Sequence, residues 1–328
     1  MVPITFVCCI ESGWLEVQTL RMIESLRRWG GAYASCPVYA VTPRFGPPIS
    51  KNTRIQLEQL QVQYISFTSR HKYSWNKFLN KLMALKAVED IAETEFIGWL
   101  DSDLLIVDEP SEFMMKEDFS FVACPADKLT NETSGADDPN DPYWRQICKC
   151  VDIDIEALPW VSSEPQHSPM RFCFNSGVFV YRRSTNFAQH YLDTFTRLCD
   201  AQVMSNRSGF FFNDQVALGL TVAKMQIPWD TLSYSHNFSI GTCVPKNWYT
   251  QEYLQTAKII HHHDAMWPWF WDTFYFAVNA SHPYVGEWLV QIGPMQIEAP
   301  MRSRVMKKML EFYRKRKELA YSKLCRSY

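Results

Sequence analysis

The sequence feature that most constrains this chain is the stretch 96–110, in which two apolar runs enclose a pair of aspartates. The first run, 96–100, leads directly into Asp101 and Asp103, and the second run begins at Leu104. A buried strand tolerates apolar residues on both faces, but two carboxylates in its middle would lose their hydration. The strand must therefore reach an edge or a cleft at Asp101. In an open α/β sheet that place is the crevice at the carboxyl ends of the strands, where ligands bind.

Two carboxylates separated by one residue can project to the same side of an extended or tightly turned backbone. A hard divalent cation, which takes oxygen ligands, is their natural partner. The simpler alternative is a loop with two solvated aspartates, and the chain contains another Asp-x-Asp at Asp152 and Asp154. That second pair lies in a polar, proline-bounded region with no strong strand before it. We therefore predict a function for the first pair only.

The composition is that of an ordinary globular protein. Of 328 residues, 47% are hydrophobic and 21% are charged, which suits one large α/β domain or two small ones. No apolar run approaches the roughly 20 residues of a transmembrane helix, and the first strand begins without a basic leader, so we expect no signal peptide. The ten cysteines lack the paired spacing of metal sites. They are typical of reduced thiols in a cytoplasmic protein.

Strands and helices alternate through the first half of the chain. Apolar runs predict strands at 4–10, 37–41, 62–67 and 96–100, and helical periodicity predicts helices at 17–29 and 76–92. The first strand passes through a glycine-containing turn into the first helix, which is how a nucleotide-binding βαβ unit begins, although no G-x-G-x-x-G is present. We predict a doubly wound, Rossmann-like and mostly parallel sheet with helices on both faces, as one domain over residues 1–300.

The segment 125–170 breaks this pattern. It is rich in Asp, Asn, Pro, Ser and Thr and has few periodic apolar positions. Because it is too long for an ordinary connection, we predict an irregular lid or binding loop, with a disordered insertion as the alternative. Beyond it we predict strands at 172–181, interrupted at 175–177, and at 258–263, and helices at 187–201 and 214–224.

Four polar elements fall at the ends or turns of these predicted strands and helices. They are Asp101-Ser102-Asp103, Asn175-Ser176-Gly177, Asp214-Gln215 and the three histidines at 261–263. Each alone has an ordinary explanation: Asn-Ser-Gly is often a bulge, and Asp-Gln before an apolar helix is often a cap. Neighbours on a strand alternate, so at most His261 and His263 share a face. Imidazole together with carboxylates suits Mn²⁺-type ions.

In this order the elements resemble a GT-A glycosyltransferase of the family-8 type, represented by glycogenin and the bacterial lipopolysaccharide galactosyltransferases. The family's F-N-S-G-V and D-Q-x-x-L elements match residues 174–178 and 214–218. Its late motif, H-x-x-G-x-x-K-P-W, compares in register with residues 261–269. There Asp264 replaces the glycine, and Trp267 replaces the lysine that would contact the diphosphate.

The resemblance implies that Asp101, Asp103 and His261 bind Mn²⁺ or Mg²⁺, which in turn holds the diphosphate of a nucleotide sugar, with UDP favoured. Glycosyl transfer breaks the anomeric C–O bond through an oxocarbenium-like transition state while negative charge develops on the departing diphosphate. A dication neutralises that charge as a Lewis acid and template. The acceptor would be a glycan, a lipid-linked glycan or a protein, and the segment 125–170 would lie on the acceptor side.

The resemblance also assigns roles to the other polar residues. Asp214 and Gln215 would be catalytic, beside the anomeric carbon. The resemblance favours retention of configuration, in which they stabilise the cation or supply a nucleophile, but Asp214 could equally be the base of an inverting enzyme. The family carries a basic residue on the helix before the Asp pair, for which we choose Lys81 over Lys86. The donor-binding set is then Ile10, Lys81, Asp101, Ser102, Asn175, Ser176 and Gly177.

Two other functions remain open from the sequence. The first is a metal-dependent hydrolase built on His261, His263 and Asp264, although the helical H-x-x-x-H spacing of many such sites is absent. The second is a catalytically inactive module that binds nucleotide sugars. Donor consumption measured with and without acceptor, together with direct nucleotide binding, would separate these alternatives.

The last segment, 301–328, is strongly basic. Residues 302–328 hold ten Lys or Arg and two Glu, a net charge of +8, so residues 1–301 carry −10. The acidic body argues against general nucleic-acid binding. Apolar residues recur between the cations, which predicts a basic amphipathic helix. It either docks on the acidic body or binds an anionic membrane surface, where each Lys or Arg contributes about 1 kcal/mol.

Overall fold

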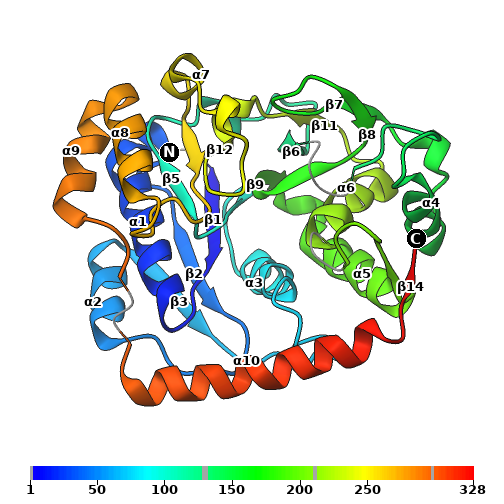
Figure 1. Ribbon diagram of the computed structural model, residues 1–328, viewed down its shortest axis with the longest axis horizontal. Helices are drawn as coiled ribbons and strands as arrows, with labels where there is room; N and C mark the ends of the chain where they lie inside the picture. Colours follow the sequence, from blue (N-terminus) through cyan, green and yellow to red (C-terminus); the bar gives the residue numbers. More distant parts are fainter. Residues whose placement is uncertain (1–2, 128–131, 210–212, 297–298) are drawn as a thin grey trace.

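The computed structural model describes residues 3–127, 132–209, 213–296 and 299–328. Helices cover both faces of a central sheet in a mixed α/β fold (Figure 1). The helices of the described residues are α1 (Trp14–Trp29), α2 (Lys51–Gln59), α3 (Leu79–Glu89), α4 (Asp141–Cys150), α5 (Phe187–Asp200), α6 (Asn213–Met225), α7 (Gln251–Gln255), α8 (Trp271–Ser281), α9 (Pro283–Ile292) and α10 (Met301–Ser322).

The central sheet has seven strands in the order β11-β6-β9-β4-β1-β2-β3. They are β1 (Ile4–Cys9), β2 (Val38–Thr42), β3 (Val62–Ser66), β4 (Phe96–Leu100), β6 (Phe121–Pro125), β9 (Phe174–Arg182) and β11 (Trp229–Thr231). β9 runs antiparallel to its neighbours β4 and β6, and the other neighbouring pairs are parallel. The predicted doubly wound, mostly parallel sheet is therefore confirmed.

Both faces of the sheet are buried, which explains the continuous apolar runs of its strands. Phe6 and Cys8 of β1 pack with the residues of α1 and α2, whereas Val7 packs on the opposite face with α3, α5 and α6. A strand between two helical layers can use apolar side chains at successive positions, since alternate residues face opposite cores. The same pattern makes the polar residues after β4 conspicuous.

A second, smaller sheet brings residues 238–261 next to the segment that follows the Asp pair. It has the order β12-β13-β5, with β5 (Leu104–Ile106), β12 (Phe238–Ser239) and β13 (Ile259–His261). β13 runs antiparallel to β5, so that His261 lies opposite Leu104, and the backbone N–H of His262 donates to the carbonyl oxygen of Asp103 at 2.9 Å. This pairing brings the late histidines to the carboxyl end of β4.

Two details of the sequence prediction are wrong. The segment 125–170 is not irregular throughout, because it contains α4 and a hairpin of β7 (Trp160–Ser162) and β8 (Pro169–Arg171). One face of α4 buries Tyr143, Trp144 and Ile147, a short apolar stripe hidden within a polar composition. β9 also continues through the Asn-Ser-Gly element, and the irregularity appears as a register shift against β6.

The basic tail forms the predicted helix, α10, which crosses the molecule below the carboxyl ends of β1, β2 and β3 (Figure 1). After it, β14 (Arg326–Ser327) pairs with β10 (Val203–Met204). In the described part of the chain, no helix combines the length and the apolar character needed to cross a membrane.

Candidate active site

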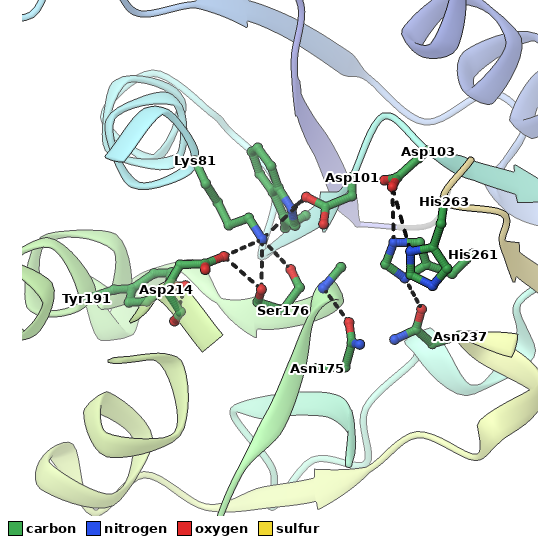
Figure 2. A network of polar contacts seen from close by, with 12 residues as sticks. Lys81, Asp101, Asp103, Asn175, Ser176, Tyr191, Asp214, Asn237, His261 and His263 are labelled. Atoms are coloured by element: carbon green, nitrogen blue, oxygen red, sulfur yellow. Dashed lines mark hydrogen bonds and ion pairs between the residues drawn. The ribbon is translucent and has the colours of Figure 1, made fainter. Parts of the chain in front are cut away.

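Two adjoining polar clusters lie where the chain turns from β4 into β5 (Figure 2). One surrounds the ammonium group of Lys81, and the other surrounds the carboxylate of Asp103. The first draws its residues from α3, β4, β9 and α6, and the second combines the turn after β4 with β13. The site is thus assembled from segments of the chain that are far apart in the sequence, at the sheet edge where α/β proteins bind ligands.

Lys81 is the centre of the first cluster. Its Nζ donates to the carbonyl oxygen of Ser176 at 2.7 Å and to the Ser176 hydroxyl at 2.9 Å. It forms ion pairs with Asp214 Oδ2 at 3.0 Å and Asp101 Oδ1 at 3.3 Å. Burial acts to lower the pKa of Lys81, but the two carboxylates outweigh it and raise that pKa above its ordinary value. The ammonium is therefore a fixed positive charge inside the site.

Asp101 faces this cluster rather than the histidines. Its Oδ1 accepts a hydrogen bond from the indole Nε1–H of Trp99 at 2.7 Å in addition to the Lys81 ion pair. Burial raises the pKa of Asp101, and Lys81 opposes that rise. Figure 2 shows Asp101 turned toward Lys81, with Asp103 on the side of the imidazoles.

The second cluster consists of Asp103, His261 and His263. Asp103 Oδ2 lies 3.4 Å from His261 Nε2 and 4.0 Å from His263 Nδ1, and the two imidazole rings stack with their centroids 4.0 Å apart. Among the described residues these three offer ligand atoms that all lie within 4.8 Å of one another. A carboxylate and two imidazoles within that distance fit a transition-metal ion such as Mn²⁺.

His263 joins the cluster because of its backbone. Its φ of 49° lies in the left-handed region, which is uncommon for a residue with a side chain. Such a conformation costs about 1–3 kcal/mol and persists only where the surroundings enforce it. Here it follows the end of β13 and leaves the His263 ring stacked on His261. The two imidazoles thus lie together because of this left-handed residue and not through alternation along a strand, since β13 ends at His261.

His261 also forms a hydrogen bond through the ring nitrogen that does not face Asp103. Its Nδ1 lies 3.0 Å from the amide oxygen of Asn237, which can only accept, so Nδ1 carries the proton. The other ring nitrogen, Nε2, faces Asp103 and is the atom that would bind a metal, as in a metal-ligating histidine whose Nδ1 is hydrogen-bonded. Burial would lower the pKa of His261, but Asp103 raises it, and His261 correspondingly holds the pKa of Asp103 below its usual range.

Two glycines lie where a side chain would collide with the histidine segment. A Cβ on Gly177 would lie 2.8 Å from Cε1 of His261, and a Cβ on Gly241 would lie 2.9 Å from Oδ1 of Asp264 and 3.1 Å from Cβ of His263. These distances are shorter than ordinary contacts between non-bonded heavy atoms. Gly177, a member of the predicted donor-binding set, therefore leaves space for the His261 ring.

Asp214 and Gln215 lie in the first turn of α6 and are both buried. Asp214 Oδ2 accepts a hydrogen bond from the Ser176 hydroxyl at 2.8 Å beside the Lys81 ion pair, and Tyr191 donates to the Asp214 backbone oxygen at 2.7 Å. These contacts direct the Asp214 carboxylate into the first cluster. Gln215 hydrogen-bonds the thiol of Cys173.

The remaining predicted residues surround the two clusters with different contacts. Ile10 is buried at the end of β1, and its carbonyl oxygen accepts from the Thr42 hydroxyl. Ser102 lies in the turn between Asp101 and Asp103. The Asn175 side-chain oxygen accepts from the Gly177 backbone N–H at 2.8 Å, so it is held against the backbone of β9.

Asp264 does not join the histidines. Its carboxylate accepts from the backbone N–H of Thr242 at 2.9 Å and from the Thr242 hydroxyl. The His261, His263 and Asp264 set of the hydrolase alternative is therefore not brought together. Asn237 was not predicted as a site residue, because no local pattern points to it, and His263 was predicted as a ligand only in the hydrolase alternative.

Comparison with known proteins gives a consistent result. A family model described as the Rhodobacterales glycosyltransferase domain matches residues 6–226, which is more than half of the chain. No curated protein matches the sequence.

Solved structures give a similarity of fold. The chain aligns with the galactosyltransferase LgtC in complex with donor and acceptor sugar analogs at a TM-score of 0.50 and 12% identity, over 92% of this chain and 99% of LgtC. An active-site mutant of LgtC gives a TM-score of 0.51 and 13% identity over the same shares. The apo bifunctional glycosyltransferase WbbM gives 0.51 and 12%, covering 87% of this chain and 50% of WbbM, so this chain spans half the length of WbbM.

Proposed function

Because the chain belongs to the Rhodobacterales glycosyltransferase family and is a glycosyltransferase, we propose that it moves a sugar from a nucleotide diphosphate sugar to a glycan, lipid-linked or protein acceptor. UDP is the favoured nucleotide, by resemblance to family-8 enzymes. The observation that carries this proposal is that the two clusters adjoin at the carboxyl end of β4. A carboxylate and two imidazoles with ligand atoms within 4.8 Å of one another lie next to the cluster that holds the buried Asp214 carboxylate.

We propose that a divalent cation, Mn²⁺ before Mg²⁺, is held by Asp103, His261 and His263. The ligand atoms of these three residues support this choice, because Mg²⁺ prefers oxygen ligands whereas imidazole suits transition metals. The hydrogen bond from His261 to Asn237 supports it independently by fixing the tautomer. When bound, such a cation supplies positive charge to the departing diphosphate. We assign Asp101 to orienting Lys81 instead of to the cation.

The first cluster would act on the sugar. Lys81 and Ser176 orient the Asp214 carboxylate, which we place beside the anomeric carbon. There its negative charge would stabilise the oxocarbenium-like transition state without any rearrangement during the reaction. Gln215 on the same turn of α6 would contact the sugar with its amide, and we favour retention of configuration. The turn at Ser102 and the strand residues Asn175 and Gly177 would form the backbone wall of the donor site.

The experiment that tests this proposal is a screen of nucleotide sugars for thermal stabilisation, followed by an assay of donor turnover with and without acceptor. A ligand that binds only the folded protein raises its melting temperature. We expect stabilisation by one UDP-sugar in the presence of Mn²⁺, and loss of turnover when EDTA is added. Full turnover in excess EDTA would contradict the cation site. The absence of stabilisation by every nucleotide sugar would contradict the donor assignment.

We further propose that residues 1–300 form the transferase domain, that 125–170 contributes to the acceptor side, and that α10 binds an anionic membrane surface. The outer face of α10 exposes an apolar stripe, formed by Met301, Val305, Met309, Phe312 and Leu319. Cations border this stripe, as in helices that lie in the membrane interface. Co-sedimentation with vesicles containing anionic lipid should fall in Phe312→Glu, and unchanged co-sedimentation would contradict the membrane assignment.

A further inference from the structure

The inner face of α10 is hydrogen-bonded to loops at the carboxyl edge of the sheet and to the end of α5. Lys307 Nζ donates to the backbone oxygen of Ser12, in the loop after β1, at 2.9 Å. Arg314 donates to the backbone oxygen of Phe45, in the loop after β2, at 2.6 Å. Tyr321 is buried and donates to the backbone oxygen of Cys199 at the end of α5. These anchors run along the length of α10 and leave space between them.

Two cavities occupy that space, and Trp75 lines both of them. The first, of about 450 Å³, lies between α10 and the loops that follow β2 and β3. The second, of about 500 Å³, lies between α10 and the start of α3. Neither lining includes a residue of the two clusters of the active site. The cavities are therefore separate from the site proposed for the donor.

The first cavity is strongly cationic. Arg44, Lys72, Arg314 and Lys317 line it, and no Asp or Glu does so within the described residues. Glu11 pairs with Arg44 and Asp200 pairs with Lys72 from outside the lining. Arg314 and Lys317 form no ion pair with any carboxylate in the described ranges. Burial lowers the pKa of Arg314, and the neighbouring Arg44 acts in the same direction, whereas Glu11 and Glu311 oppose them.

The other lining residues suit a sugar. Trp75 and Tyr313 give the first cavity aromatic faces, and Lys317 already lies over the Tyr313 ring at 5.6 Å. Hydroxyl groups from the loops after β3 complete the wall. Aromatic faces with a few polar groups are the ordinary surroundings of a bound sugar ring, and guanidinium and ammonium groups bind oxyanions.

The second cavity leads toward the active site. Lys77 lines it and lies four residues before Lys81, in the turn that precedes α3, and Gly209 lines it five residues before Asp214. Burial lowers the pKa of Lys77, whereas the carboxylates of Asp214, Glu318 and Asp103 act to raise it. A ligand that extended from the first cavity past Trp75 would enter the side of the site where Asp214 lies.

We propose that the two cavities form the acceptor site, and that the acceptor carries a phosphate or carboxylate group that Arg314 and Lys317 bind in the first cavity. The inference rests on the proposed transferase function and names the chemical class of its acceptor. Trp75 stacks on a sugar ring between the two cavities, and the reacting hydroxyl points through the second cavity toward Asp214. The basic inner face of α10 then has a role separate from that of its apolar outer face.

The test measures binding of three probes by titration calorimetry: glucose 6-phosphate, glucuronate and glucose. Two anionic probes distinguish a phosphate from a carboxylate preference, and glucose reports the neutral sugar. We expect at least one anionic probe to bind ~10-fold more tightly than glucose, since hydrogen bonds to charged groups are the stronger ones. Lys317→Glu should remove that preference, and Lys317→Gln should weaken it. Equal binding of all three probes to the wild-type protein would overturn the inference.

The matched control is Lys308→Glu, which makes the same charge change on an exposed position of α10 that lines neither cavity. It should leave binding of the probes unchanged, and equal losses in both variants would overturn the inference. Donor turnover without acceptor should be unchanged in Lys317→Glu. A loss of UDP binding in Lys317→Glu would show that the first cavity belongs to the donor site, and it would overturn the inference. If no nucleotide sugar is turned over while probe binding still depends on Lys317, the transferase proposal fails and the anion site stands.

Discussion

The two Asp-x-Asp pairs have the same pattern and opposite surroundings. Asp101 and Asp103 follow a buried strand and are each 27% exposed, with Lys81 against one carboxylate and His261 against the other. Asp152 is 73% exposed and pairs with Arg197 on the surface, and the Asp154 carboxylate accepts a hydrogen bond from the backbone N–H of Glu156.

The difference lies in what surrounds the carboxylates. The first pair lies at the edge of two sheets, where strands and helices from distant parts of the chain converge on it. The second pair follows α4, where Asp152 forms surface ion pairs with Arg197 and Lys224 and Asp154 begins a short turn. Within the first pair the two residues also differ, since Asp101 faces a cation of the protein itself and Asp103 faces two ligand-type imidazoles. A short motif therefore has no function apart from its place in the fold.

The largest effect is expected from Asp103→Ala. Removal of this carboxylate takes away the oxygen ligand of the cation site, so donor turnover should fall by ~1,000-fold, the upper range for loss of one electrostatic contact. Asp152→Ala is the matched control and should retain wild-type turnover. Steady-state assays with Mn²⁺ and the UDP-sugar identified in the screen measure both. Equal losses in the two variants would remove the distinction between the pairs.

Asp214→Asn should lower turnover by at least ~100-fold, the scale of positioned acid–base or electrostatic assistance. Asparagine keeps the shape of the side chain and its hydrogen bond to Ser176, but it leaves Lys81 with Asp101 as its one described carboxylate. Nucleotide affinity, measured by calorimetry on the folded variant, should stay near the wild-type value, because the affected contact is made in the transition state. Turnover close to wild type would exclude Asp214 from the chemistry.

A comparison of His263→Ala with Asp101→Asn tests whether the cation is held by the Asp103 cluster, to which His263 belongs, or also by Asp101. Loss of the His263 imidazole should weaken Mn²⁺ binding by about 10-fold or more, the range seen when groups around a metal are removed. Asp101→Asn should change Mn²⁺ affinity less than His263→Ala, because its Oδ1 faces Lys81 and Trp99. Calorimetric titration of Mn²⁺ without donor gives both values. The reverse order would return Asp101 to the metal-ligand set predicted from the sequence.

The smallest effect concerns the close packing of Gly177 against His261, beside the first Asp pair. Gly177→Ala should lower the free energy of unfolding by about 1–3 kcal/mol, as overpacking does, since the added methyl group meets the His261 ring. Gly46→Ala is the control, because a Cβ there has no neighbour within 4 Å. Urea denaturation measures both. An unchanged Gly177→Ala variant would mean that the ring moves freely.

The sequence by itself determined the type of sheet, five of the ten helices of the described residues (α1, α3, α5, α6 and α10) and the position of the first Asp pair. Those features follow from apolar periodicity over a few residues and from the cost of burying charge, both of which are local. The same reasoning failed for α4, because its apolar stripe is short and lies within a polar segment. It also expected an interruption in β9 where the strand continues and its partner shifts register.

Only the tertiary structure decided how the polar residues pair. Nothing near Asp101 in the sequence indicates that its carboxylate forms an ion pair with Lys81. Nothing near His261 indicates that its ring forms a hydrogen bond with Asn237. The antiparallel pairing of β13 with β5 and the left-handed backbone at His263 bring the second imidazole to Asp103. These contacts join residues far apart in the chain, and a pattern with a period of two or 3.6 residues describes which face a side chain takes without specifying its partner.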